Sequence, residues 1–150
     1  MNPAEYFTEI FKSVDEEETG KVAVVELKEE LEYLRVPEEF IERLSKPVEA
    51  AKEGKLEVDD FKLLMLDASE ASIELLMFLK LCREIDKENK GTINQSELMR
   101  AIKLSGIKHE ELQAQRIMNE LGDIERDVEY EEPEAQKVFI QFLTSWPKIL

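Results

Sequence analysis

Two twelve-residue segments of the chain place oxygen-bearing side chains at spacings that suit a divalent cation. Loop one runs from Asp15 to Glu26, and loop three runs from Asp86 to Glu97. Each has Asp first, Gly sixth, an apolar residue eighth and Glu twelfth. A short carboxylate can ligate from a helix end, Gly permits a sharp turn, and the longer Glu can reach back with both oxygens. The pattern therefore predicts a cation-binding loop in each segment.

Helical patterns flank both segments. In the N-terminal stretch, Phe7, Ile10, Phe11 and Val14 recur on one helical face. A longer apolar stripe runs from position 75 to position 85 and ends directly before loop three. Only five Gly and five Pro occur, which favours helices over a turn-rich β fold. We therefore expect helix–loop–helix units, four in all.

The spacing of small apolar residues in the loops supports a repeat. Val22, Leu56, Ile93 and Val128 are separated by 34, 37 and 35 positions. A period of about 35 residues that joins paired helices through a short loop is typical of a repeated supersecondary unit. We call residues 49–60 loop two and residues 121–132 loop four.

These residues resemble the EF-hand superfamily, which includes calmodulin, troponin C and the myosin light chains. The resemblance covers nearly the whole chain and implies an all-α fold of four EF-hand units in two lobes. It also implies that the small apolar residues of the loops pair across short β bridges, loop one with loop two and loop three with loop four. It places an N-terminal pair at 1–68, a linker within a central helix at 69–74, and a C-terminal pair with an extended last helix at 75–150.

The EF-hand resemblance assigns ligands in loop one. They are Asp15, Glu17, Thr19, the Lys21 carbonyl and Glu26. Glu17 is one methylene longer than the usual residue, and Ala23 leaves the ninth position to water. Loop one is nevertheless the best of the four, and calcium or magnesium is the expected ion.

The other loops depart further from the family pattern. The loop-three ligand positions are Asp86, Glu88, Lys90, Thr92 and Glu97. Lys90 puts an ammonium where an oxygen belongs, which opposes a cation. Loop two has Ala51 at a ligand position, and loop four has Leu121 first and Arg126 in place of the turn glycine. We expect loops two and four to bind no metal.

Composition excludes several classes of function. A net charge of −15 argues against nucleic acid as a partner. No run of about 18 apolar residues is present, so no membrane span is expected. Cys82 is the one cysteine, and the first residues show no signal-peptide pattern, so a cytoplasmic location is expected. His109 is the one histidine, and it has no nucleophile beside it in the sequence, so we expect no enzyme activity.

The resemblance then implies a binding module. The expected partner is an amphipathic basic helix, such as an IQ motif of a myosin heavy chain, held largely independently of calcium. The alternative is a calcium sensor or buffer that works through loop one and loop three. The expected partner-binding residues are Met65, Met77, Leu79, Met99, Met118, Phe142 and Trp146.

The C-terminal segment has an apolar face of its own. We expect Phe142, Leu143 and Trp146 to pack onto the C-terminal lobe and partly fill its groove. Truncation after Gln141 would then strengthen partner binding by about 1 kcal/mol, because a competitor is removed. The alternative is that Trp146 is exposed at a frayed end.

Overall fold

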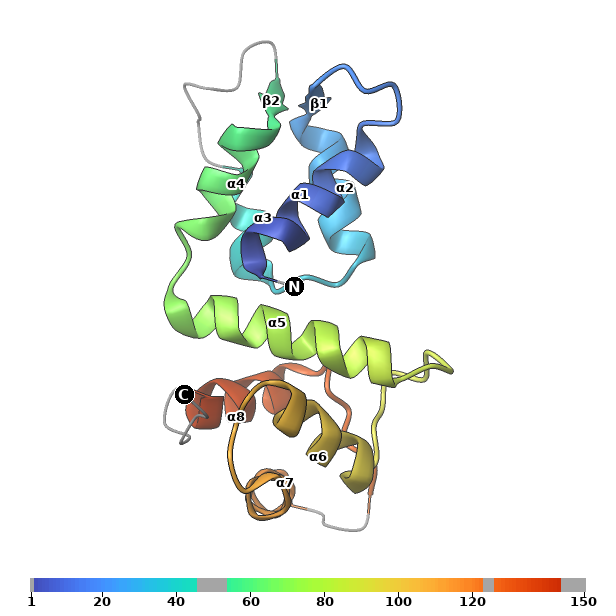
Figure 1. Ribbon diagram of the computed structural model, residues 1–150, viewed down its shortest axis with the longest axis vertical. Coiled ribbons are helices and arrows are strands. Elements are labelled where there is room, and N and C mark those ends of the chain that lie inside the picture. The colour runs from blue at the N-terminus through green and yellow to red at the C-terminus, as the bar shows by residue number, and fades with distance from the viewer. Residues whose placement is uncertain (1, 46–53, 123–125, 144–150) are drawn as a thin grey trace. The chain divides into compact units, whose positions relative to one another are not determined.

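The computed structural model describes residues 2–45, 54–122 and 126–143. Over these ranges the chain is mostly helical, in agreement with the expected all-α class, and two short strands form one small sheet (Figure 1). The elements in chain order are α1 (Pro3–Val14), β1 (Lys21–Ala23), α2 (Val24–Tyr33), α3 (Glu38–Arg43), β2 (Lys55–Glu57), α4 (Val58–Leu66), α5 (Glu70–Ile85), α6 (Gln95–Leu104), α7 (Glu110–Glu120) and α8 (Pro133–Leu143).

The chain forms two compact units, which we call unit 1 (Met1–Ile73) and unit 2 (Glu74–Leu150). In unit 1, Asn2 caps α1 by accepting a hydrogen bond from the backbone N–H of Glu5 at 2.8 Å. The apolar face of α1 packs against α2 and α4. The Phe7 ring lies between those of Phe40 and Phe61, with ring centroids 5.8 and 6.0 Å away. These aromatic contacts lie at the centre of the core of unit 1.

The core of unit 2 is built around the apolar stripe of α5. Leu75, Leu79 and Cys82 are buried there with side chains from α6, α7 and α8. Phe78 and Phe139 meet edge to face, with ring centroids 4.9 Å apart. Burial raises the pKa of the Cys82 thiol, so this side chain acts as a small core hydrophobe rather than as a nucleophile.

The loops pair as the family resemblance implies. Strands β1 and β2 are antiparallel, with Val22 opposite Leu56. In unit 2, Ile93 and Val128 form an isolated bridge whose two N···O distances are 2.9 and 2.7 Å. All four side chains are buried. Each pairing joins two loops of one unit through backbone hydrogen bonds.

The segment expected as a central helix is interrupted. Helix α4 ends at Leu66 and α5 begins at Glu70, so the stretch between Asp60 and Asp86 is two helices rather than one. Ser69 accepts a hydrogen bond from the backbone N–H of Ser72 at 3.2 Å, which is a cap for a new helix. Within the described ranges, every helix falls short of the length and apolar character that crossing a bilayer needs.

Candidate functional site

Loop one folds around the carboxylate of Asp15. Its Oδ1 accepts from the backbone N–H of Thr19 at 3.0 Å, and its Oδ2 accepts from that of Gly20 at 2.9 Å. The Thr19 hydroxyl lies 3.1 Å from Asp15 Oδ1 and 2.8 Å from the Lys21 carbonyl oxygen. Gly20 has a φ of +80°, the left-handed conformation that favours glycine. Three of the oxygens assigned as ligands are thus neighbours.

All five residues predicted as ligands in loop one line a cavity of about 300 Å³. Its lining includes Asp15, Glu17, Thr19, Lys21 and Glu26. Carboxylate, hydroxyl and carbonyl oxygens are the donors that calcium and magnesium prefer, so these residues fit a hard cation. Within the described ranges, no group of three or more Asp, Glu, His or Cys side chains is placed to hold a metal. The carboxylates of loop one would have to converge to bind one.

Loop one has a positively charged neighbour that sequence reasoning missed. Lys55 of β2 lines the same cavity, because it stands opposite Ala23 in the β1–β2 register. An ammonium at this edge opposes a divalent cation. The pairing of Val22 with Leu56, which the family resemblance implies, could have located this lysine.

We expect the substitution Glu26→Gln to abolish the tightest divalent-ion site of the protein, with a loss of more than about tenfold in affinity. The change removes the charge of the twelfth-position carboxylate, which the family resemblance assigns to supply two oxygens. Calorimetric titration of the metal-free protein with calcium measures it. Glu29→Gln, on the same helix but outside the cavity lining, is the matched control. Survival of the site in Glu26→Gln would place the tightest site elsewhere.

Loop three is closed by a contact from loop four. The buried carboxylate of Asp86 accepts from the backbone N–H of Lys90 at 3.1 Å and from that of Gly91 at 2.8 Å. The hydroxyl of Tyr130 donates to the same carboxylate at 2.8 Å. Tyr130 is fully buried. Sequence reasoning missed it, because the donor lies 44 positions from its acceptor and no loop pattern marks it.

The pKa of Asp86 follows from this contact. Burial alone would raise the pKa, but hydrogen bonds from Tyr130 and from the Lys90 and Gly91 amides outweigh it, so the pKa is lowered. A lowered carboxyl pKa means that the contribution to stability is present at neutral pH. It is lost as the pH falls through the folded-state pKa.

We expect Tyr130→Phe to lower the free energy of unfolding of unit 2 by about 2 kcal/mol at pH 7, the usual size of a hydrogen bond to a charged group. The difference between the variant and the parent should shrink as the pH falls toward the folded-state pKa of Asp86, because a protonated carboxyl is no longer a charged acceptor. Urea unfolding at pH 7 and pH 3 measures both effects. Tyr33→Phe, at a side chain 80% exposed, is the control. Equal stability of Tyr130→Phe and the parent at pH 7 would contradict this assignment.

Lys90 forms an ion pair inside loop three. Its ammonium lies 2.8 Å from Glu88 Oε2. The hydrogen bond and charge of Glu88 raise the pKa of Lys90, and the charges of Asp127 and Glu97 act in the same direction. Asp127 belongs to loop four, so both loops direct negative charge at this ammonium. An ammonium therefore lies among the carboxylates that would have to hold a cation.

A second cavity, of about 320 Å³, brings the loop-three positions together. Asp86, Glu88, Lys90, Thr92 and Glu97 all line it. Glu97 is already engaged, because its carboxylate accepts from the backbone N–H of Asn94 at 3.0 Å in a capping box that starts α6. A cation in this cavity would compete with both the capping box and the Lys90–Glu88 pair.

The loops expected to bind no metal are described only in part. The loop-two positions Glu49, Ala51 and Glu53 lie outside the described residues, as do Asp123 and Glu125 of loop four. Leu121, the first residue of loop four, packs against the core of unit 2. An apolar side chain therefore occupies the position that the family uses for its first ligand.

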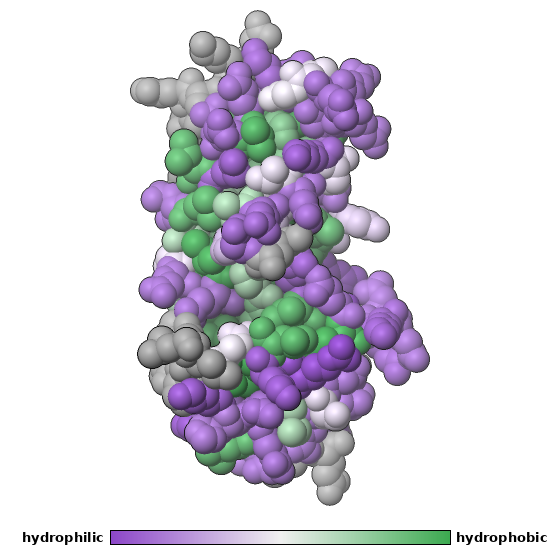
Figure 2. Space-filling model, in the orientation of Figure 1, coloured by the Kyte–Doolittle hydropathy of each residue, from purple (hydrophilic) through white to green (hydrophobic). Residues whose placement is uncertain are grey.

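The residues assigned to partner binding lie mostly in the cores. Met65, Leu79, Met118 and Phe142 are buried, Met77 and Met99 are half-buried, and Trp146 lies outside the described residues. Exposed apolar side chains occur elsewhere, on both units, and green surface is visible among the purple in Figure 2. Among the described residues, the exposed large hydrophobic side chains are Val25, Tyr33, Leu63, Leu66, Leu104 and Leu112.

Comparison with known proteins gives a weak similarity to one class of transporter. No protein-family model matches the chain. The chain is 26% identical over 123 residues to the mitochondrial adenyl nucleotide antiporter SLC25A24 of Bos taurus, and 28% identical over 121 residues to that of Homo sapiens. These alignments cover 81% and 79% of this chain but 24% of each antiporter. The chain thus spans about a quarter of the length of the curated relatives that it matches.

Proposed function

We propose that this chain is a non-enzymatic binding subunit of the calmodulin-like or myosin light chain-like kind. In this proposal it holds an amphipathic basic helix of a partner protein, largely independently of calcium. The observation that carries the proposal is that loop three is held by groups of the protein itself. Asp86 accepts three hydrogen bonds and Lys90 pairs with Glu88. Because these contacts already hold loop three in its folded conformation, no ion is needed to position the two helices that flank it.

Charge favours a basic partner. The chain carries a net charge of −15, which attracts and steers a cationic segment. Exposed apolar side chains occur on both units, and an amphipathic helix would offer them an apolar face. An IQ-type helix, including that of a myosin heavy chain, has this chemistry and is the proposed partner class. The EF-hand resemblance supports the same choice.

The alternative function is a calcium sensor or buffer that works through loop one. It is favoured by the cavity at which the five predicted positions of that loop meet. Lys55 at the cavity edge weighs against tight binding. Calorimetric titration of the metal-free protein separates the two functions, because a sensor releases or absorbs heat at micromolar calcium and the proposed constitutive subunit does not.

A synthetic peptide tests the proposed partner class. The probe is a helix of about 20 residues with Arg and Lys on one face and Ile, Leu and Phe on the other. The control keeps the apolar face and replaces each basic residue with Glu. We expect the basic peptide to bind at micromolar or tighter concentration and the acidic control to bind at least about a hundredfold more weakly. Equal binding of the two peptides would show that charge complementarity does not contribute to partner binding.

A further inference from the structure

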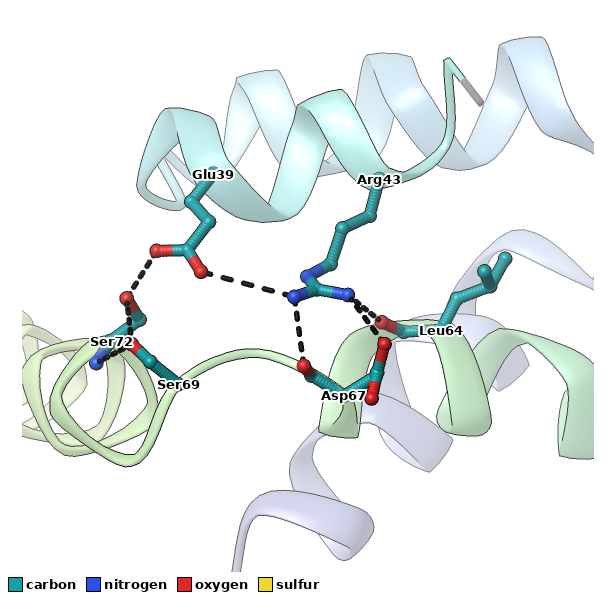
Figure 3. Close-up of polar contacts among 6 residues, drawn as sticks. All are labelled: Glu39, Arg43, Leu64, Asp67, Ser69 and Ser72. Atoms are coloured by element: carbon teal, nitrogen blue, oxygen red, sulfur yellow. Dashed lines mark hydrogen bonds and ion pairs between the residues drawn. The ribbon is translucent and has the colours of Figure 1, made fainter. Parts of the chain in front are cut away.

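Helix α3 presents two charged side chains to the junction between α4 and α5 (Figure 3). Arg43 points toward the end of α4, and its side chain is only 14% exposed. Its guanidinium donates to the carbonyl of Asp67 at 2.8 Å, to that of Leu64 at 3.3 Å and to the Asp67 carboxylate at 3.3 Å. The last carbonyls of a helix have no donor within the helix. Arg43 supplies that donor from a different helix.

Glu39 holds the other side of the same junction. It lies one turn before Arg43 on α3 and accepts a hydrogen bond from the hydroxyl of Ser72 in the first turn of α5. Ser72 in turn accepts from the hydroxyl of Ser69, which caps α5. The polar contacts therefore run without a gap from the end of α4, through α3, to the start of α5, as Figure 3 shows.

We propose that α3 braces the α4–α5 junction (residues 67–73), so that α3 and the junction unfold locally as one cooperative unit. We call this bracing role of α3 the splint. The two anchoring side chains sit on one short helix and grip opposite sides of the junction. If α3 moved alone, the half-buried Arg43 would lose its acceptors, which is costly for a charged donor. An opening in which residues 67–73 move together with α3 keeps these contacts and therefore costs less free energy.

The splint has a consequence for signalling along the chain. Helix α5 starts at the junction, and its later turns carry Leu75, Phe78 and Leu79 of the unit 2 core. A ligand that displaces α3 therefore also disturbs the first turn of α5, which belongs to unit 1. This inference goes beyond the proposed function, because it requires neither a metal nor a particular partner.

Native-state hydrogen exchange of the full chain tests the splint. We expect the protected amides of α3 and of residues 70–73 to share one opening free energy and one dependence on urea. Different values for the two segments in the parent protein would overturn the proposal. Ser72→Ala removes one hydroxyl and keeps the packing. We expect it to raise exchange across both segments by at least about tenfold relative to α1, because it removes the charge-assisted hydrogen bond to Glu39 and the hydrogen bond from the Ser69 hydroxyl.

Two further variants make the test specific. Arg43→Gln removes the guanidinium and should separate the openings of the two segments. Lys62→Gln breaks an exposed ion pair with Asp59 on α4 and should leave both segments within about twofold of the parent. If Arg43→Gln does not fold, Ser72→Ala alone decides. Unchanged exchange in Ser72→Ala, or an equal rise over all of unit 1, would overturn the proposal. Either result would show that α3 packs against the junction without opening together with it.

Discussion

Phe142→Ala is expected to lower the free energy of unfolding of unit 2 by about 3–4 kcal/mol, the usual result of removing a buried aromatic ring. Phe142 is only 7% exposed and belongs to the core that α5, α6 and α7 share with α8. The guanidinium of Arg116 lies 5.2 Å from the centre of its ring, a cation–π contact that the substitution also removes.

Urea unfolding followed by circular dichroism measures the loss. Exchange of the Leu98 and Ile117 amides assigns it to unit 2, because both residues are fully buried there. Leu112→Ala, at a side chain 54% exposed, is the control and should change stability by less than about 0.5 kcal/mol. A loss below about 1 kcal/mol in Phe142→Ala would mean that α8 contributes little to the core.

The burial of Phe142 and Leu143 changes the expectation for truncation after Gln141. Both side chains are part of the unit 2 core rather than occupants of a separate groove. Cutting them away removes two core residues, at a cost comparable to the whole stability of a small domain. The truncation is therefore expected to unfold unit 2 instead of strengthening partner binding. The position of Trp146 lies outside the described residues.

Lys90→Asp is expected to raise the calcium affinity of loop three by at least tenfold, about 1.4 kcal/mol. The substitution changes the local charge by two units and supplies an oxygen at the fifth position. It also releases Glu88, which now pairs with the ammonium at 2.8 Å. Asp127 from loop four adds a further negative charge at the same cavity.

Calorimetric titration with calcium, in parent and variant, measures the gain. Lys108→Asp makes the same charge change in unit 2 at an exposed position outside the loop-three cavity, and it controls for the overall charge. A gain in Lys90→Asp but not in Lys108→Asp supports the local explanation. No gain in either would identify the Tyr130 clamp on Asp86, or the geometry of Glu88, as the feature that keeps loop three from binding calcium.

The sequence predicts what repeats locally. The helical faces follow from short-range periodicity, whereas the pairing of Val22 with Leu56 and of Ile93 with Val128 follows from the family resemblance of the twelve-residue loops, which recur about every 35 positions. The five positions assigned to each of loops one and three also meet at a cavity, because a turn glycine and a terminal glutamate fix the path of the loop.

Contacts between distant segments were beyond that reasoning. Tyr130 reaches Asp86 from another loop, and Arg43 reaches Asp67 from another helix. Such pairs depend on tertiary packing, which no single sequence pattern encodes. The break between α4 and α5 is an intermediate case. Ser69 marks a helix cap in the sequence, but the apolar pattern on either side of it favours a continuous helix.

The most direct test of the central claim is the affinity of the full chain for the basic amphipathic peptide, measured twice. One titration contains a calcium chelator and the other contains saturating calcium. The two dissociation constants are expected to lie within about threefold of each other, because the contacts of Asp86 already hold loop three in its conformation without an ion. An affinity at least tenfold tighter in calcium would contradict the claim and make the chain a calcium-gated sensor.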